Sequence, residues 1–504
     1  MRKFFKTVAI VTVFSISEKF LGFLYRIFLS RTIGSEGIGV YQVALSVFAL
    51  LLTVCSSGTP VTVSRLITKY RAEGKHDRVN KVITAGISFT VLISLPICLI
   101  FFAFGKHFHF LFTDPRCMDI FLIVLPALIF NSVYSVLRGV FWGDKDFLPY
   151  SIIELLEEIC MITVGIILIN GVTDAYTGAF KAGVAVFVSY LFSFTLATIT
   201  FFIRKHTLKN PRTEFKPLLT SALPITAMRT ANSLTVSLIS IILPARLVLA
   251  GYSSSKAMAS FGAAMGQAIP LLFIPTTLIG SFTLVLIPEI SENFYKKQDF
   301  YLKRDIEKAI KFTTFLTGLF IPVFFVCGEE IGILIFSSHE CGSYLTASAF
   351  LMLFMGLSNV TTSMLNSMGL EHKTLVYFII SGIFMLICIW FLPMFLGTYA
   401  LLVGFTFIYG LTTVLNLILL HKNCRQKLKY LKFLFCSCGL LVPTAILGLM
   451  LEKMLLPVLG TFFTFAVCGV IMVIFNALLY VGFGLVSAQF LRTRIRSNLK
   501  RKKA

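Results

Sequence analysis

The chain has 504 residues, of which 57% are hydrophobic and only 13% are charged, and its mean hydropathy is +0.88. Soluble globular proteins carry about 25% charged and about 45–50% apolar residues, so the composition excludes that class and predicts a polytopic membrane protein. The net charge of +22 does not indicate nucleic-acid binding, because the loops between the apolar stretches are too short to hold a soluble domain.

Two apolar stretches, 4–30 and 38–66, begin the chain, and each exceeds the ~20 residues that a membrane-crossing helix needs. A short glycine-containing turn joins them, which predicts a transmembrane hairpin. No small-residue cleavage site follows the first apolar run, so we interpret it as an uncleaved helix and not as a signal peptide. Glu18, Lys19 and Arg26 lie inside the first arm, where each would cost about 2.5–3.5 kcal/mol if it faced lipid, so we expect them to face a hydrated interior.

A sliding apolar window predicts twelve further spans, for fourteen in all. With an even number of spans both termini lie on one side, and the stretches assigned to the cytoplasm then hold 35 of the 45 Lys and Arg residues. The outer loops hold six, so we expect a cell-membrane protein with both termini in the cytoplasm. The further spans are 82–105, 120–140, 148–170, 181–203, 217–249, 257–287, 307–327, 343–366, 374–392, 399–420, 432–452 and 460–490.

An internal repeat is indicated at an offset of 228 residues, which relates Pro60 to Pro288 and Lys145 to Lys373. The offset contains six spans, so both copies keep the same orientation in the membrane. The fold class expected is therefore all-α, with two parallel six-helix lobes and two further helices. The predicted boundaries are 1–205 for the first lobe, 206–216 for a cytoplasmic linker, 217–422 for the second lobe, 423–490 for the two extra helices, and 491–504 for a basic cytoplasmic tail.

One cluster of carboxylates lies at the start of the fifth span, in the sequence SIIELLEEICMI. Glu154 shares a helical face with Glu157 or Glu158, so two like charges at membrane depth would hold a proton or recruit a cation. Coupling of an ion through Glu157 and Glu154 is one interpretation. The other is that one of these carboxylates pairs with a basic residue of the first helix.

Further polar residues lie in the spans that follow the linker. Arg229 has Asn232 one turn further on, and Gln267 lies among glycines and prolines in a later span. Each has two interpretations: Arg26 and Arg229 either line a cavity or close ion pairs, and Gln267 either meets a substrate or links helices. The eleven cysteines form no CxxC pair and no histidine cluster joins them, so we expect no metal, disulfide framework or cofactor.

Two segments carry a resemblance to a known family. The stretch LGFLYRIFLSRTIGSEGIGVYQ with SSGTPVTVSRL, and MASFGAAMGQAIPLLFIPTTLIGSFTLVLIPEISE at 258–292, resemble the stage V sporulation protein B family. The wider group contains polysaccharide flippases and MurJ-type lipid II flippases. The resemblance implies a two-lobed exporter of the MOP superfamily that moves a lipid-linked oligosaccharide or a peptidoglycan precursor across the cytoplasmic membrane by alternating access. It also implies a role in spore cortex synthesis.

A polyprenyl diphosphate-linked sugar makes physical demands on such a protein. Its anionic head cannot cross hydrocarbon alone, and arginine suits a diphosphate because its planar fork gives paired, charge-assisted hydrogen bonds. The substrate-binding residues expected are Arg26, Arg229, Lys19, Asn232 and Gln267.

Two other classes of membrane protein compare with the flippase as interpretations of the sequence. A multidrug or cation antiporter of the MATE type is the alternative, because it shares the expected architecture. An enzyme is not expected, since the chain has no large catalytic loop and no paired acidic metal motif. The partners expected are the lipid-linked sugar and membrane lipids, with no nucleic acid, and the protein is expected to be a monomer.

Overall fold

The computed structural model describes residues 2–424 and 428–485, and every regular element in these ranges is helical. Helices satisfy all their backbone hydrogen bonds internally, which a lipid environment requires. The predicted all-α class is confirmed. The predicted basic tail at 491–504 and the last residues of the predicted span 460–490 lie outside the described residues.

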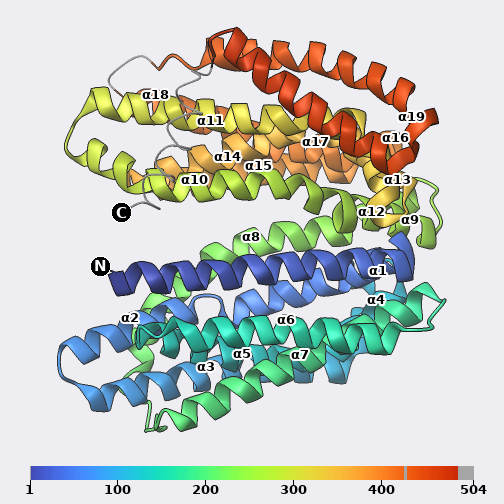
Figure 1. Cartoon of the computed structure of the whole chain (residues 1–504). Coiled ribbons are helices and arrows are strands. Elements are labelled where there is room, and N and C mark those ends of the chain that lie inside the picture. Colours follow the sequence, from blue (N-terminus) through green and yellow to red (C-terminus); the bar gives the residue numbers. More distant parts are fainter. Residues whose placement is uncertain (1, 425–427, 486–504) are drawn as a thin grey trace. The chain divides into compact units, whose positions relative to one another are not determined.

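The helices form two compact units, the first ending at Gly262 and the second beginning at Ala263 (Figure 1). The predicted lobe boundaries at 205 and 217 stay predictions. The first unit holds α1 (Arg2–Ser56), α2 (Thr59–Ala72), α3 (His76–Phe104), the short 3-10 helix η1 (Gly105–Leu111), α4 (Pro115–Val124), α5 (Ala127–Gly143), α6 (Phe147–Ile169), α7 (Ala175–Ile203), α8 (Phe215–Leu249) and α9 (Ser254–Phe261).

The second unit continues from the π-helical turn η2 (Gly262–Ala268), and its described helices end at Gly482. It comprises α10 (Ile269–Tyr295), α11 (Asp299–Val326), α12 (Gly328–Phe336), α13 (His339–Ser348), α14 (Leu351–Ser367), α15 (Glu371–Phe391), α16 (Pro393–Leu396), η3 (Gly397–Tyr399), α17 (Ala400–Thr406), η4 (Phe407–Leu411), α18 (Thr412–Asn423) and α19 (Leu431–Gly482).

Both of the longest helices are broken by a glycine. Gly34 in α1 has φ 69° and ψ 179°, and Gly460 in α19 has φ 69° and ψ 172°. Residues with a Cβ rarely adopt this positive-φ conformation, so glycine allows the chain to change direction there. Gly34 falls in the turn that the sequence predicted between the first two spans.

The number of membrane crossings expected from the sequence was fourteen. Among the described residues, ten helices are long and apolar enough to cross a membrane, or up to twelve if each of two bent pairs is one span. This count treats Val13–Ala72 as a single segment of 60 residues, and it does not include α6, which carries three glutamates. A multi-pass membrane protein is confirmed, while fourteen crossings stay a prediction.

A network of ion pairs and hydrogen bonds ties three helices together at one end of the first unit. Asp114 caps the first turn of α4, accepting from the backbone N–H of Arg116 at 3.0 Å. The Arg116 guanidinium donates to Glu36 of α1 at 2.7 Å, and the Ser254 hydroxyl of α9 donates to Asp114 at 3.0 Å. The network therefore joins the second arm of α1 to α4 and α9.

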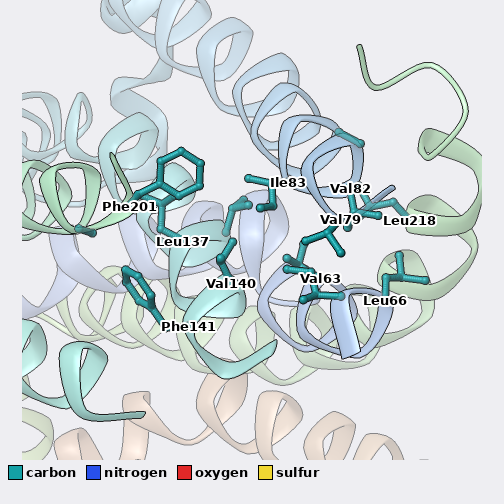
Figure 2. Packing of buried hydrophobic residues seen from close by; sticks show 14 of the residues in the cluster. Val63, Leu66, Val79, Val82, Ile83, Leu137, Val140, Phe141, Phe201 and Leu218 are labelled. Atoms are coloured by element: carbon teal, nitrogen blue, oxygen red, sulfur yellow. The ribbon is translucent and has the colours of Figure 1, made fainter. Parts of the chain in front are cut away.

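The opposite end of the first unit has an apolar core between α2, α3, α5, α7 and α8. Figure 2 shows its packing, with Leu66 of α2 and Leu218 of α8 on one side and Phe201 of α7 on the other. In the second unit a polar contact fastens α19 to α11, because Asn476 donates to the Gly318 carbonyl at 2.7 Å. Both units are thus closely packed helical bundles.

Candidate functional site

The polar residues of the first unit gather at two places, and the first is the break between α1 and α2. Pro60 has no N–H to offer the carbonyl of Ser56, so the helical hydrogen bonding fails at this point. Helix α8 fills the gap: Arg229 Nη1 donates to the Ser57 carbonyl at 2.7 Å. The Gly58 N–H donates to Thr226 Oγ1 at 3.2 Å. Two residues of α8 therefore bind the two backbone groups next to the break, the Ser57 carbonyl and the Gly58 N–H.

Arg229 is exposed and keeps most of its hydrogen-bonding capacity. Its hydrogen bond to the Ser57 carbonyl uses one nitrogen of the guanidinium, and the described residues supply no carboxylate partner. Asn232, one turn further along α8, is also exposed. Of the two interpretations of Arg229, the ion pair is absent among the described residues. Within the described residues, four of the five N–H donors of this guanidinium make no hydrogen bond.

Arg26 and Lys19 lie on the first arm of α1. Arg26 is half-buried and interacts electrostatically with Tyr41, on the second arm of the same helix. Lys19 is exposed and lies near the carboxylate of Glu18. The hairpin at Gly34 thus brings Arg26 back to the polar side chain of Tyr41, which sequence reasoning did not single out.

The second polar place is a group of carboxylates where α1, α5 and α6 meet. Glu154 of α6 accepts from Arg138 Nη1 of α5 at 3.1 Å, and the Arg138 guanidinium also stacks over the Trp142 ring. The partner of Glu154 is therefore a basic residue of α5 and not of the first helix. The predicted span 120–140 placed Arg138 two residues from its end, whereas α5 continues to Gly143. Ending that span at Gly143 would have placed Arg138 one turn from its end.

The two glutamates that follow have different surroundings. Oε2 of Glu157 is buried without a hydrogen-bond partner among the described residues. Glu158 lies against α1, with its Oε1 2.8 Å from the position that a Cβ on Gly22 would occupy. Glycine at position 22 therefore makes room for this carboxylate. The structure brings Glu154, Glu157 and Glu18 of α1 into one electrostatic group.

Two tyrosine hydroxyls border this group. Tyr134 of α5 is 3% exposed, and its hydroxyl interacts with Glu154 and Glu157. Tyr25 of α1 is 4% exposed and interacts with Glu158. Neither hydroxyl has a hydrogen-bond partner among the described residues. A tyrosine in an apolar helix is a weak signal, which is why the sequence alone did not reveal them.

Gln267 belongs to a different part of the chain from the other candidates. It lies in the π-helical turn η2 at the start of the second unit and is fully buried. Arg246, near the end of α8, is half-buried. The structure therefore brings together Glu154 and Glu157, places Arg229 with the α1–α2 break, and holds Gln267 in a separate unit.

Comparison with known proteins identifies the family. Residues 4–294 match the family described as "Polysaccharide biosynthesis protein". The chain belongs to this family. The resemblance that the motifs of the first hairpin indicated is confirmed.

Two relatives of this family member come from Bacillus subtilis (strain 168). Stage V sporulation protein B is 27% identical over 381 residues, which cover 73% of this chain and 74% of the relative. Lipid II flippase MurJ is 24% identical over 348 residues, which cover 62% of each chain. The chain is therefore similar in sequence both to a sporulation protein and to a lipid II flippase.

Solved structures show the fold that this family member shares. The structure titled "Lipid II flippase MurJ, inward closed conformation" has a TM-score of 0.70 at 14% identity, covering 94% of this chain and 99% of that chain. An inward-facing multidrug resistance MATE family transporter has a TM-score of 0.64 at 14% identity, covering 81% and 93%. The chain therefore shares the fold of these two transporters.

Proposed function

We propose that this protein is a transporter, and not an enzyme, which flips a lipid-linked oligosaccharide or peptidoglycan precursor across the cytoplasmic membrane, with a polyprenyl diphosphate-linked sugar as its substrate. The observation that carries the proposal is Arg229, an exposed guanidinium within a membrane-length helix that binds a neutral carbonyl and no carboxylate among the described residues. An unpaired charge at that depth costs several kcal/mol unless an anion or water meets it. A diphosphate head supplies such an anion.

The other proposed substrate contacts are Arg26, Lys19, Asn232 and Gln267. A guanidinium fork gives two parallel hydrogen bonds to a phosphate, whereas Lys19 supplies a point charge. Asn232 and Gln267 have amide groups that hydrogen-bond sugar hydroxyls. Family membership and the named relatives support this assignment, and a role in spore cortex synthesis is part of the proposal through the likeness to stage V sporulation protein B.

We also propose the finer architecture of fourteen crossings, two six-helix lobes and cytoplasmic termini. A helix of 60 residues would extend about 90 Å, three times the hydrocarbon thickness of about 30 Å. The broken segment Val13–Ala72 therefore suits two crossings. Helix α6 has 23 residues, which is enough for one crossing, although it carries three glutamates.

Of the two glutamates proposed to couple an ion, Glu157 is the stronger candidate and Glu154 the weaker. Arg138 already neutralises Glu154, while Oε2 of Glu157 lacks any partner among the described residues. A carboxyl in that position is the one that gains most from a proton or a cation. If Glu157 couples transport, Glu157→Gln abolishes the dependence of transport on the ion gradient while the protein still binds its substrate.

A second candidate function is cation or drug antiport of the MATE type. The observation that favours it is the carboxylate group of Glu18, Glu154, Glu157 and Glu158, because carboxylates attract cations. Mass spectrometry of the lipids that copurify with the protein separates the two functions. A flippase retains a polyprenyl diphosphate sugar, and Arg229→Gln reduces its amount. Absence of that lipid, together with binding of organic cations, would favour the antiporter.

Complementation provides the functional test. Arg26→Ala and Arg229→Ala should each fail to restore growth to a strain that lacks its own flippase, although both variants still insert into the membrane. Lys216→Ala is the control, because Lys216 is an exposed cation on α8 whose side chain has no partner among the described residues. Normal growth with both arginine variants would overturn the assignment of these residues to the substrate site.

A further inference from the structure

A second arginine lies, like Arg229, where α8 contacts the start of α2 and the break before it. Arg65 of α2 is exposed, and its Nη2 donates to the hydroxyl of Ser221 on α8 at 2.5 Å. The arrangement mirrors that of Arg229, which reaches from α8 to Ser57 at the break before α2. Each helix thus contributes one arginine, and each arginine rests on a neutral oxygen of the other side.

The two contacts are spaced regularly along the crossing of α2 and α8. Ser221 and Arg229 are eight residues apart in α8, which corresponds to about 12 Å along that helix. Ser57 and Arg65 are also eight residues apart in the sequence. Thr226 lies between them and accepts from the Gly58 N–H at 3.2 Å. The two guanidinium groups therefore sit at successive levels of one helix–helix seam.

The packing beneath Arg65 fixes its position. Leu66, next to it in sequence, and Leu218, one turn before Ser221, both belong to the apolar core between α2 and α8 (Figure 2). The close approach of α8 also depends on Gly58, since a Cβ there would collide with the Ala222 carbonyl. The backbone around Arg65 is thus rigid, while its guanidinium remains exposed.

The partners of Arg65 distinguish it from nearby arginines at the same end of the first unit. Arg71 binds Asp144 at 2.6 Å, Arg78 binds Glu214 at 3.2 Å, and Arg204 binds Asp146 at 2.6 Å. These carboxylates neutralise the three guanidinium groups and hold loops together. Within the described residues Arg65 has no carboxylate, so its charge is available to an anion.

We propose that Arg65 forms a second phosphate-binding subsite, separate from that of Arg229, for the phosphate-bearing head of the substrate. The inference rests on the proposed function. A single diphosphate is too short to span about 12 Å, so the head binds the two arginines in succession. Ser221 is the positioning residue that orients the Arg65 fork.

The test is binding of defined lipids to the full-length protein in nanodiscs. Undecaprenyl diphosphate is the diphosphate probe, and phosphatidylglycerol is the probe for an ordinary phospholipid headgroup. Arg65→Gln should weaken binding of undecaprenyl diphosphate about tenfold, the loss expected for a charge-assisted hydrogen bond. Arg65→Lys should restore part of the affinity, Ser221→Ala should have a smaller effect, and Lys216→Gln should have none.

The outcomes separate this inference from the proposed function. If the wild-type protein binds undecaprenyl diphosphate no better than phosphatidylglycerol, the proposed function fails. If the wild-type protein prefers undecaprenyl diphosphate and Arg65→Gln binds it with unchanged affinity, the subsite is overturned and the function stands. Equal weakening for both lipids would also overturn the subsite, because Arg65 would then bind phospholipid headgroups in general.

Discussion

The arginines of the first unit differ in what they bind. Arg138, Arg116 and Arg71 donate to carboxylates at 3.1, 2.7 and 2.6 Å, whereas Arg229 and Arg65 donate to a carbonyl and a hydroxyl. A carboxylate neutralises a guanidinium and makes it structural, while a neutral acceptor orients the guanidinium and leaves its charge in place. This difference, and not the presence of arginine alone, selects the substrate residues.

The pair of Arg138 and Glu154 should therefore act on stability. Arg138→Gln leaves the Glu154 carboxylate without its cation, which should cost about 1–3 kcal/mol of unfolding free energy. The double variant Arg138→Gln/Glu154→Gln should recover most of that loss, because no charge then remains unpaired. Thermal unfolding of the detergent-solubilised protein measures both effects. A double variant as unstable as the sum of its single variants would contradict this role.

A close approach of two backbones offers a second prediction at this scale. A Cβ on Gly139 of α5 would lie 2.6 Å from the carbonyl oxygen and 2.9 Å from the Cα of Pro60, and backbone atoms cannot yield easily. Gly139→Ala should thus destabilise the protein by about 1–3 kcal/mol, as overpacking does. Gly439→Ala in α19 is the matched control, since nothing lies within 4 Å of its Cβ position. Equal melting temperatures for the two variants would argue against the packing of α5 on α2.

At the scale of helices, the break between α1 and α2 is the element that positions Arg229. Pro60 lacks the N–H that would bond the Ser56 carbonyl, and beside this break the Ser57 carbonyl accepts from Arg229 in place of the N–H of Val61. Pro60→Ala should allow an unbroken helix, in which the N–H of Val61 competes with the Arg229 guanidinium for the Ser57 carbonyl. We expect unchanged or higher thermal stability together with slower transport. A variant that transports at the wild-type rate would show that the break does not position the site.

The network that joins α1, α4 and α9 through Asp114 and Arg116 should make stability depend on pH. Burial raises the pKa of the Asp114 carboxyl, but hydrogen bonds from Arg116 and Ser254 outweigh it, and the pKa lies below its ordinary value of 3.8. A depressed pKa contributes stability above the ordinary value, and that stability is lost as the pH falls through the folded-state pKa. Asp114→Asn should lower the melting temperature at pH 7 and flatten its decline below about pH 4. The same acid-induced decline in both proteins would contradict the pKa assignment.

Across the whole molecule, the sequence predicts features that depend on local chemistry. The glycine turn at Gly34, the all-helical class and the family follow from apolar length, turn residues and motifs. The partners of charged residues do not, because they depend on which helices meet in three dimensions. Glu154 finds Arg138 on α5, and Arg65 meets Ser221 of α8, which is 156 positions away in the chain. No local spacing encodes such pairs.

Transport of a lipid-linked diphosphate sugar in reconstituted vesicles tests the central claim most directly. The protein is placed in liposomes with an undecaprenyl diphosphate-linked sugar, and the fraction of sugar reachable by an external lectin is followed over time. We predict that the wild-type protein exposes the inner-leaflet sugar, that Arg229→Gln does so at least tenfold more slowly, consistent with loss of a charge-assisted hydrogen bond, and that Lys216→Gln matches the wild type. Equal rates for vesicles with and without the wild-type protein, or for wild type and Arg229→Gln, would contradict the claim.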